Sequence, residues 1–301
     1  MRVAVTGAAG RLGSALVTAL ADAPFTGPAG PIAWGRDAFD LDTPDGVVAR
    51  LDRDRPEVVV HAAAWTDVDG CALDPALAMQ RNATATGVLA EACAARGTDL
   101  LIVSTNEVFD GSRTDGRPYE PTDPPCPGNP YGASKAEGER LATVAFFRRP
   151  GASLGIARTA WLFGAPGRDF PSRILEAAER ARAAGEPLRA VGDEWGTPTY
   201  TADAAEAIVE LLAADAIAGI HHAVNGLVAT RADWARYVVA RAGLEVEVVN
   251  VPSSTWQRPS HPPRWGVLAQ TPLPSGEPLR AWPDAMADYA PHLLRATGIR
   301  A

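Results

Sequence analysis

The feature of this 301-residue sequence that most constrains its fold is an alternation of short β-branched runs with stretches rich in Ala and Leu. The short runs lie at residues 2–7, 56–65, 99–105 and 153–164, and helix-like stretches follow the first three at 11–23, 75–97 and 134–147. Continuous apolar strands separated by helices are typical of a parallel sheet covered on both faces. The sequence therefore predicts an α/β protein with a doubly wound parallel sheet.

The rhythm weakens after Gly164, where prolines become frequent. Residues 252–278 contain too many prolines for regular structure, yet they keep Trp256 and Trp265, which a linker has little reason to carry. We expect residues 1–163, with later segments at roughly 190–225, to form the main domain. Residues 164–301 should form mainly a smaller C-terminal lobe packed over the strand ends.

The composition excludes several classes of function. A balance of 28 basic against 36 acidic residues gives a formal charge of -8, which argues against a nucleic-acid-binding surface. Cys71, Cys93 and Cys126 form neither a CxxC pair nor a metal-ligand spacing, so we expect free thiols and no metal site. We find no signal peptide and no segment with the roughly 18 apolar residues of a membrane span. We therefore expect a cytoplasmic protein that binds neither nucleic acid nor membranes.

A glycine-rich loop, VTGAAGRLG, ends the first strand and runs into a helix. A dinucleotide needs one glycine at the turn, a second where backbone meets pyrophosphate and a third where helix meets strand. The position after the opening strand of an alternating chain predicts a Rossmann domain that binds NAD(P). The expected contacts from this loop are Gly7, Gly10, Arg11, Leu12 and Gly13.

The end of the second strand bears on the choice of cofactor. An acidic residue there favours NAD, whereas an arginine accommodates a 2′-phosphate. Here the strand ends in Gly35 and Arg36, and Arg11 lies in the glycine loop, so NADPH is the preferred cofactor and NADH the second candidate. The alternative is that both arginines are solvated surface residues. Asp42 would lie beside the adenine or cap the short helix that follows.

Small residues end the next strand in the motif HAAAW. Ala62, Ala63 and Ala64 leave room for a ligand to lie against backbone, although packing of helix on sheet also favours small residues. His61 is more typical of a buried core residue than of a catalyst.

Polar side chains end the strand at 99–105, where Ser104 and Thr105 are followed by Asn106 and Glu107. Downstream, Tyr131 and Lys135 stand at i and i+4 of an expected helix, about one turn apart on one face. An ammonium group near a phenol favours phenolate, so we expect Lys135 to lower the Tyr131 pKa from about 10 and to allow proton exchange near neutrality.

These motifs together resemble the extended short-chain dehydrogenase/reductase superfamily, and most of all the dTDP-4-dehydrorhamnose reductase family. The resemblance runs from Met1 to about Asn225 and includes HAAAWTDVD, STNEVFDG, NPYGASKAEGE, RTAWLFG and GTPTYTADAA. It implies a catalytic triad of Thr105, Tyr131 and Lys135. It also implies cofactor contacts from Ser104, Tyr131 and Lys135, and substrate contacts from Thr66, Asn106, Glu107, Trp161, Phe170, Arg173 and Thr199.

Two departures from the family pattern affect the expected substrate. The reductases usually read Thr-Asp-Tyr at the strand end and the related dTDP-glucose 4,6-dehydratases read Thr-Asp-Glu, whereas this chain reads Thr105-Asn106-Glu107. Asn106 cannot supply the acidic proton of an elimination. Glu107 could bind a sugar hydroxyl, assist proton exchange or cap the loop. Near the C-terminus, Trp265-Gly266 replaces the usual Asn-Ser.

The resemblance implies an NADPH-dependent oxidoreductase of deoxysugar biosynthesis that reduces the C4 ketone of a nucleotide-linked 4-keto-6-deoxysugar of the dTDP type. One alternative is an epimerase or dehydratase that retains its cofactor, and another is a non-catalytic NADP-binding subunit. The expected partner is the nucleotide-sugar substrate, and the family suggests a homodimer.

Overall fold

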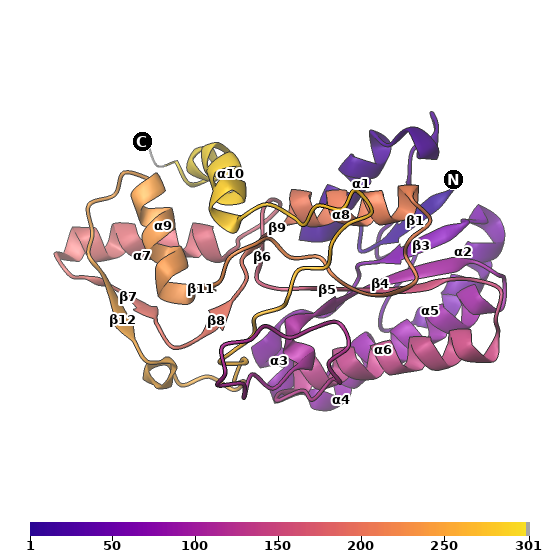
Figure 1. Ribbon diagram of the computed structural model, residues 1–301, viewed down its shortest axis with the longest axis horizontal. Helices are drawn as coiled ribbons and strands as arrows, with labels where there is room; N and C mark the ends of the chain where they lie inside the picture. The colour runs from indigo at the N-terminus through magenta and orange to yellow at the C-terminus, as the bar shows by residue number, and fades with distance from the viewer. Residues whose placement is uncertain (299–301) are drawn as a thin grey trace.

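A six-stranded parallel sheet forms the centre of the larger part of the protein (Figure 1). In the computed structural model, which describes residues 1–298, the strand order is β10-β5-β4-β3-β1-β2. The bounds are β1 (Val3–Thr6), β2 (Ile32–Trp34), β3 (Val58–His61), β4 (Asp99–Thr105), β5 (Leu154–Thr159) and β10 (Gly219–His222). The chain passes to opposite sides of β1 when it forms β2 and β3, and the crevice at such a reversal is where doubly wound sheets bind ligands.

Helices cover both faces of the sheet, as the alternation predicts. One face carries α1 (Arg11–Ala21) and α8 (Thr201–Ala213), and the other carries α2 (Val47–Asp54), α5 (Ala85–Ala94) and α6 (Pro130–Arg148). A separate apolar cluster packs each helical layer against the sheet. Leu16 and Ile208 belong to the cluster under α1 and α8, and Leu89 and Phe146 belong to the cluster under α2, α5 and α6. The predicted doubly wound parallel sheet is confirmed. Its edge strand β10 and the helix α8 come from residues beyond 200.

Several short elements connect these layers. They are η1 (Pro24–Thr26), η2 (Pro44–Gly46), α3 (Val68–Leu73), α4 (Pro75–Ala78), the π-helical turn η3 (Met79–Thr84) and η4 (Asn106–Val108). Since α4, η3 and α5 follow one another directly, residues 75–94 form one nearly continuous helical stretch. The sequence predicts this helix over 75–97 but not its π-helical turn.

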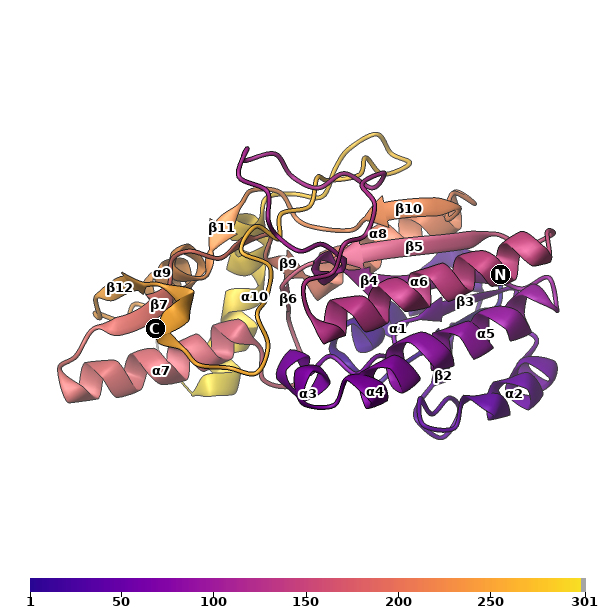
Figure 2. The same ribbon diagram turned by 90° about the horizontal axis from the view of Figure 1, so that it is seen from below.

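A smaller lobe lies to one side of the sheet (Figure 2). It contains α7 (Phe170–Ala184), α9 (Arg231–Arg241), α10 (Trp282–Thr297) and three strand pairs. The pairs are β6 (Leu162–Phe163) with β9 (Thr199–Tyr200), β7 (Leu188–Val191) with β12 (Val248–Val251), and β8 (Trp195–Gly196) with β11 (Ala229–Thr230). Its own apolar core is built around the buried Trp234. Residues 299–301, which belong to the lobe expected from the sequence, lie outside the described residues.

The proline-rich segment at 252–266 joins the two parts rather than serving as a loose linker. It contains only the short η5 (Ser253–Thr255). Its backbone at Ser253 is held by Asp193 of the lobe, while Arg258 pairs at 3.0 Å with Asp69 on α3. The indole of Trp265 donates to a backbone carbonyl at 2.8 Å, which explains why a proline-rich segment keeps a tryptophan. Within residues 1–298, no helix combines the length and apolarity needed to cross a membrane.

Candidate active site

The glycine loop has the close approaches that a nucleotide cradle requires. Gly7 has a φ of 64°, and a Cβ there would lie 2.8 Å from the backbone of Ala63. A Cβ on Gly13 would overlap the Gly7 carbonyl, so this glycine lets α1 pack against the loop. Gly10 is the N-cap of α1 and offers no side chain to the first N–H groups. Those N–H groups are therefore free to bind a phosphate.

A cavity of about 320 Å³ opens at this loop. Its walls include Gly7, Gly10, Arg36 and the three alanines 62–64, as the sequence predicts, together with Trp65 and Arg81. Ser104, near the end of β4, has a buried hydroxyl without a hydrogen-bond partner among residues 1–298. The cradle, the alanine wall and this unpaired hydroxyl fit a dinucleotide.

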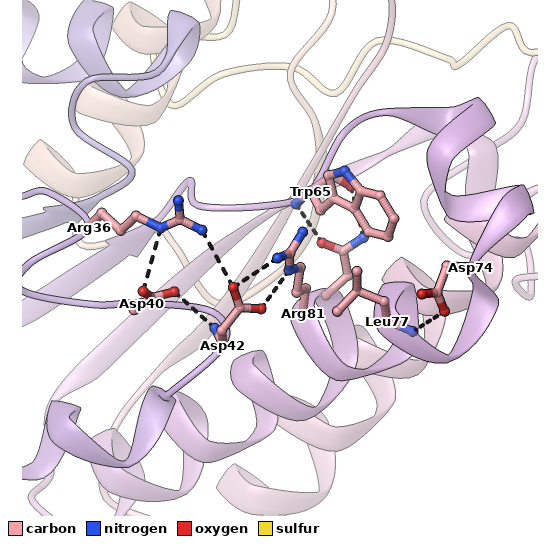
Figure 3. A network of polar contacts seen from close by, with 8 residues as sticks. Arg36, Asp40, Asp42, Trp65, Asp74, Leu77 and Arg81 are labelled. Carbon is pink, nitrogen blue, oxygen red and sulfur yellow. Dashed lines mark hydrogen bonds and ion pairs between the residues drawn. The ribbon is translucent and has the colours of Figure 1, made fainter.

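An ion-pair network includes three residues of the cavity wall, Arg36, Asp40 and Arg81 (Figure 3). Arg36 lies 3.5 Å from both Asp40 and Asp42, and Arg81 of η3 holds Asp42 in a bidentate pair at 2.6 and 2.8 Å. The hydrogen bonds from Arg81 hold the pKa of Asp42 below its usual value. The N-cap of η2 is Thr43, so the alternative role of Asp42 as a helix cap is wrong. The sequence analysis missed Arg81, because a single arginine in a helical stretch carries no signal of its own.

Two residues of the glycine loop direct their side chains away from the cavity. The Arg11 guanidinium donates to the carbonyls of Gly164 and Arg168 and lies 3.8 Å from Asp169. Arg11 therefore joins the loop to the smaller lobe and does not line the cavity. The side chain of Leu12 is buried in the core between α1 and the sheet, which leaves only its backbone for a cofactor.

The start of α6 brings Tyr131 to the end of β4. Asn129 caps the helix by accepting the Gly132 N–H at 2.8 Å, and Pro130 occupies the first helical position. A Cβ on Gly132 would overlap the Glu107 carbonyl, so glycine lets η4 lie directly on the helix start. Tyr131 is buried there, close enough to Thr105 for the Thr105 hydroxyl to affect its pKa. One turn later, Lys135 Nζ donates to the Val103 carbonyl at 2.8 Å.

The pKa of Tyr131 shifts in the direction opposite to the prediction. Burial, and next the charge of Glu107, raise the pKa of Tyr131 above its ordinary value, while the Thr105 hydroxyl lowers it. The prediction that Lys135 lowers the Tyr131 pKa is therefore wrong for this structure. Burial also lowers the pKa of Lys135, to about 8. A raised pKa favours the protonated phenol, the form that can donate a proton.

Asn106 and Glu107 are both engaged by the protein itself. The Asn106 amide donates to the Gly266 carbonyl at 3.0 Å, and a Cβ on Gly266 would overlap that amide nitrogen. The Glu107 carboxylate accepts the Asn129 amide at 2.7 Å, and burial raises its pKa. The two departures from the family pattern, at 106 and at 266, thus meet in one contact.

The expected substrate residues are scattered over the rim and the lobe. Trp161 has a φ of 45° and, like Phe170, stacks on Trp234. The Arg231 guanidinium lies 3.6 Å from the centre of the Trp161 ring and 3.9 Å from Glu194. Sequence reasoning missed Arg231 because the aromatic residues under it come from distant segments.

The remaining three expected contacts are Thr66, Arg173 and Thr199. Thr66 and Arg173 are exposed. The buried hydroxyl of Thr199 donates to the Thr197 carbonyl at 3.1 Å. His61, which the sequence assigns to the core, is buried and forms hydrogen bonds with the Thr6 and Thr86 hydroxyls. Burial lowers the pKa of His61 to about 3.

Comparison with known proteins places these features in a family. The family described as "RmlD substrate binding domain" matches residues 1–294. The chain belongs to this family. It is 38% identical over 301 residues to a dTDP-4-dehydrorhamnose reductase of Streptomyces griseus, covering 98% of this chain and 94% of the relative. It is 35% identical over 304 residues to a probable dTDP-4,6-dihydroxy-2-methyloxan-3-one 4-ketoreductase of Streptomyces antibioticus, covering 98% and 97%.

A solved structure agrees in fold. The dTDP-4-dehydrorhamnose reductase of Bacillus anthracis, crystallised in complex with NADP, superimposes with a TM-score of 0.85 at 25% identity, covering 97% of this chain and 99% of the other. The resemblance stated from the sequence motifs is therefore confirmed at the level of family and fold.

Proposed function

We propose that this protein is an NADPH-dependent oxidoreductase that reduces the C4 ketone of a nucleotide-linked, dTDP-type 4-keto-6-deoxysugar. The observation that carries the proposal is that Tyr131 is buried at the start of α6, one turn before Lys135, whose ammonium is anchored to the Val103 carbonyl of β4, the strand that ends in Thr105. The names of the relatives agree with this activity.

The chemistry asks the protein mainly to position groups and to deliver one proton. When bound, the reduced nicotinamide supplies a hydride to the C4 carbon. Tyr131 donates its phenolic proton to the oxygen of the former carbonyl, and Thr105 hydrogen-bonds the same oxygen. Lys135, anchored to the Val103 carbonyl, would hold the nicotinamide ribose.

Two contacts favour reduction over the elimination of water. An elimination needs an acid and a base beside each other at the end of β4. Here the amide of Asn106 is bonded to Gly266, and Glu107 supports Asn129, the cap of the catalytic helix. Glu107 thus orients α6 and keeps the Tyr131 pKa high, rather than acting as a base.

We assign residues 1–163, together with roughly 190–225, to cofactor binding and residues 164–301 mainly to the substrate. Among the expected contacts, Trp161 and Phe170 suit a sugar or base, because they stand in one aromatic layer with Arg231. Thr66, Asn106, Glu107, Arg173 and Thr199 complete the proposed substrate set.

We also propose that the protein is a cytoplasmic homodimer. The face of α5 and α6 carries a cavity whose lining combines Val88, Leu141 and Val144 with Glu91 and four arginines, and Phe147 of α6 is 87% exposed. Exposed apolar side chains beside arginines are typical of an interface. Sedimentation equilibrium at micromolar concentration tests this, and a purely monomeric protein would contradict it.

The activity is tested by incubating the protein with NADPH and a panel of nucleotide-linked 4-keto sugars while following the loss of reduced nicotinamide. Tyr131→Phe keeps the ring but removes the donor, so turnover should fall on the order of 10²- to 10⁴-fold while NADPH binding persists. Tyr237→Phe is the matched control, because its hydroxyl bonds the Pro283 carbonyl within the lobe. Full turnover in Tyr131→Phe, or a product lighter by one water from a nucleotide-linked glucose, would refute the proposal.

A further inference from the structure

The adenosine end of the cofactor cavity contains an apparent contradiction. Arg36 favours binding of a 2′-phosphate there, but Asp40 and Asp42 lie 3.5 Å from the Arg36 guanidinium. Acidic residues at this place favour the free 2′-hydroxyl of NAD and repel a phosphate. Arg36 with two carboxylates alone would carry a net charge of about -1, which is the wrong sign for NADPH.

Arg81 removes the contradiction. It comes from η3, 39 residues along the chain from Asp42, and it lines the same cavity as Arg36. Two of its nitrogens bond both oxygens of Asp42, at 2.6 and 2.8 Å, and its guanidinium carbon lies 5.2 Å from the centre of the Trp65 ring (Figure 3). A planar, bidentate arginine pair of this kind is the strongest form of carboxylate neutralisation. Arg81 resides in a π-helical turn, a distortion frequent at functional sites.

We propose that Arg81 is a specificity-determining residue, which selects NADPH over NADH by neutralising Asp42. With Arg81 present, the four charged side chains sum to zero. Arg36 is then free to turn from its aspartates to the phosphate, since both of its contacts are loose at 3.5 Å and its side chain is 74% exposed. Arg81 is only 24% exposed and stays on Asp42. Arg81 thus acts through Asp42, as a positioning residue, and Arg36 contacts the phosphate.

The inference rests on the proposed function only for the identity of the cofactor, and it is tested by binding without any sugar. Nicotinamide fluorescence gives the Kd of NADPH and of NADH for wild type, Arg81→Met, Asp42→Asn and the double variant. Arg81→Met leaves the Asp42 carboxylate unneutralised beside the 2′-phosphate. The Kd of NADPH should therefore rise on the order of fivefold, the effect expected from the repulsion of charges about 6 Å apart in a water-like dielectric. NADH, which lacks the phosphate, should bind as before.

The double variant provides the sharpest test, because it returns the sum of charges to zero. Asp42→Asn in the Arg81→Met background should restore NADPH affinity to near wild type. Arg50→Met is the control, because it removes one positive charge near the cavity from a side chain whose hydrogen bond within residues 1–298 goes to the Asp37 carbonyl. In Arg50→Met, the ratio of the NADPH and NADH Kd values should stay within about twofold of the wild-type ratio. Added salt should reduce the difference between wild type and Arg81→Met.

Three results would overturn the inference. Equal loss of NADH and NADPH binding in Arg81→Met would make Arg81 a structural residue. Failure of Asp42→Asn to rescue would mean that Arg81 binds the phosphate itself. Equal affinity of wild type for both cofactors would remove the selectivity to be explained, even if the protein reduces the sugar. Conversely, a protein that prefers NADPH but reduces none of the sugars would contradict the proposed function and leave the role of Arg81 unaffected.

Discussion

Replacing Asn106 by aspartate tests why this chain has an amide where its relatives carry an acid. Asn106 is 3% exposed, and its amide donates to the Gly266 carbonyl at 3.0 Å. In Asn106→Asp the donor becomes a carboxylate oxygen that faces a carbonyl oxygen. The variant loses one hydrogen bond and buries an unpaired charge, so it should lose about 2–3 kcal/mol of unfolding free energy at neutral pH.

The loss should depend on pH in a defined direction. The fold disfavours the charged form of the new carboxyl, so its folded-state pKa lies above its unfolded value. The variant is therefore most stable below the unfolded pKa of about 3.9, where the protonated acid can itself donate to Gly266. The penalty grows as pH rises and is complete above the folded-state pKa.

Urea denaturation at neutral and mildly acidic pH measures both effects. Asn106→Ala is the control, because it leaves the Gly266 carbonyl without its donor but adds no titrating group. It should lose about 1–2 kcal/mol at either pH, relative to wild type under the same conditions. An Asn106→Asp protein as stable as wild type, or one whose deficit does not shrink on acidification, would refute this account of the contact.

Two further predictions concern buried charges. Lys135→Met removes an ammonium whose pKa burial lowers to about 8, so it should abolish turnover yet raise the unfolding free energy at neutral pH by about 1–3 kcal/mol. Because the folded-state pKa lies below the unfolded one, this gain should shrink as pH rises above 8 and vanish above the unfolded value; a constant gain in urea denaturation would contradict it. Arg158→Met removes the ion-pair partner of the buried Glu139, which lies 2.7 Å away, and should lower the unfolding free energy by about 3–5 kcal/mol. Adding Glu139→Leu to this variant should recover most of the lost free energy. A single variant as stable as wild type by the same assay would show that the pair contributes nothing.

The local patterns of the sequence predicted those features of the fold and site that depend on neighbouring residues. The glycine loop, the alternation of strands and helices, and the placement of Tyr131 and Lys135 one turn apart on α6 each involve residues within about one turn or one βα unit. Such features are determined by backbone geometry close in the chain. Residues in them were therefore placed from sequence alone, including Arg36 and the three alanines on the cavity wall.

The rest depends on contacts between distant residues. The bond of Asn106 to Gly266 spans 160 residues, and that of Arg11 to Gly164 spans 153. No periodicity relates such positions, so an arginine in the glycine loop was assigned to the cofactor although it holds the other lobe. The direction of the Tyr131 pKa shift was missed for the same reason, because spacing along a helix does not reveal burial or the charge of Glu107.

The late return of the chain to the sheet affects how the protein is made on the ribosome. Leu16 and Leu20 of α1 are sealed by Ile208 and Leu211 of α8, and the edge strand β10 ends only at His222. During synthesis, the first 163 residues therefore emerge with one apolar face only partly covered, because α8 is missing, and with one strand edge unpaired. A nascent chain of that length exposes apolar surface that the complete domain buries. The nucleotide cradle, although encoded by the first fifteen residues, becomes stable only after more than two-thirds of the chain has been translated.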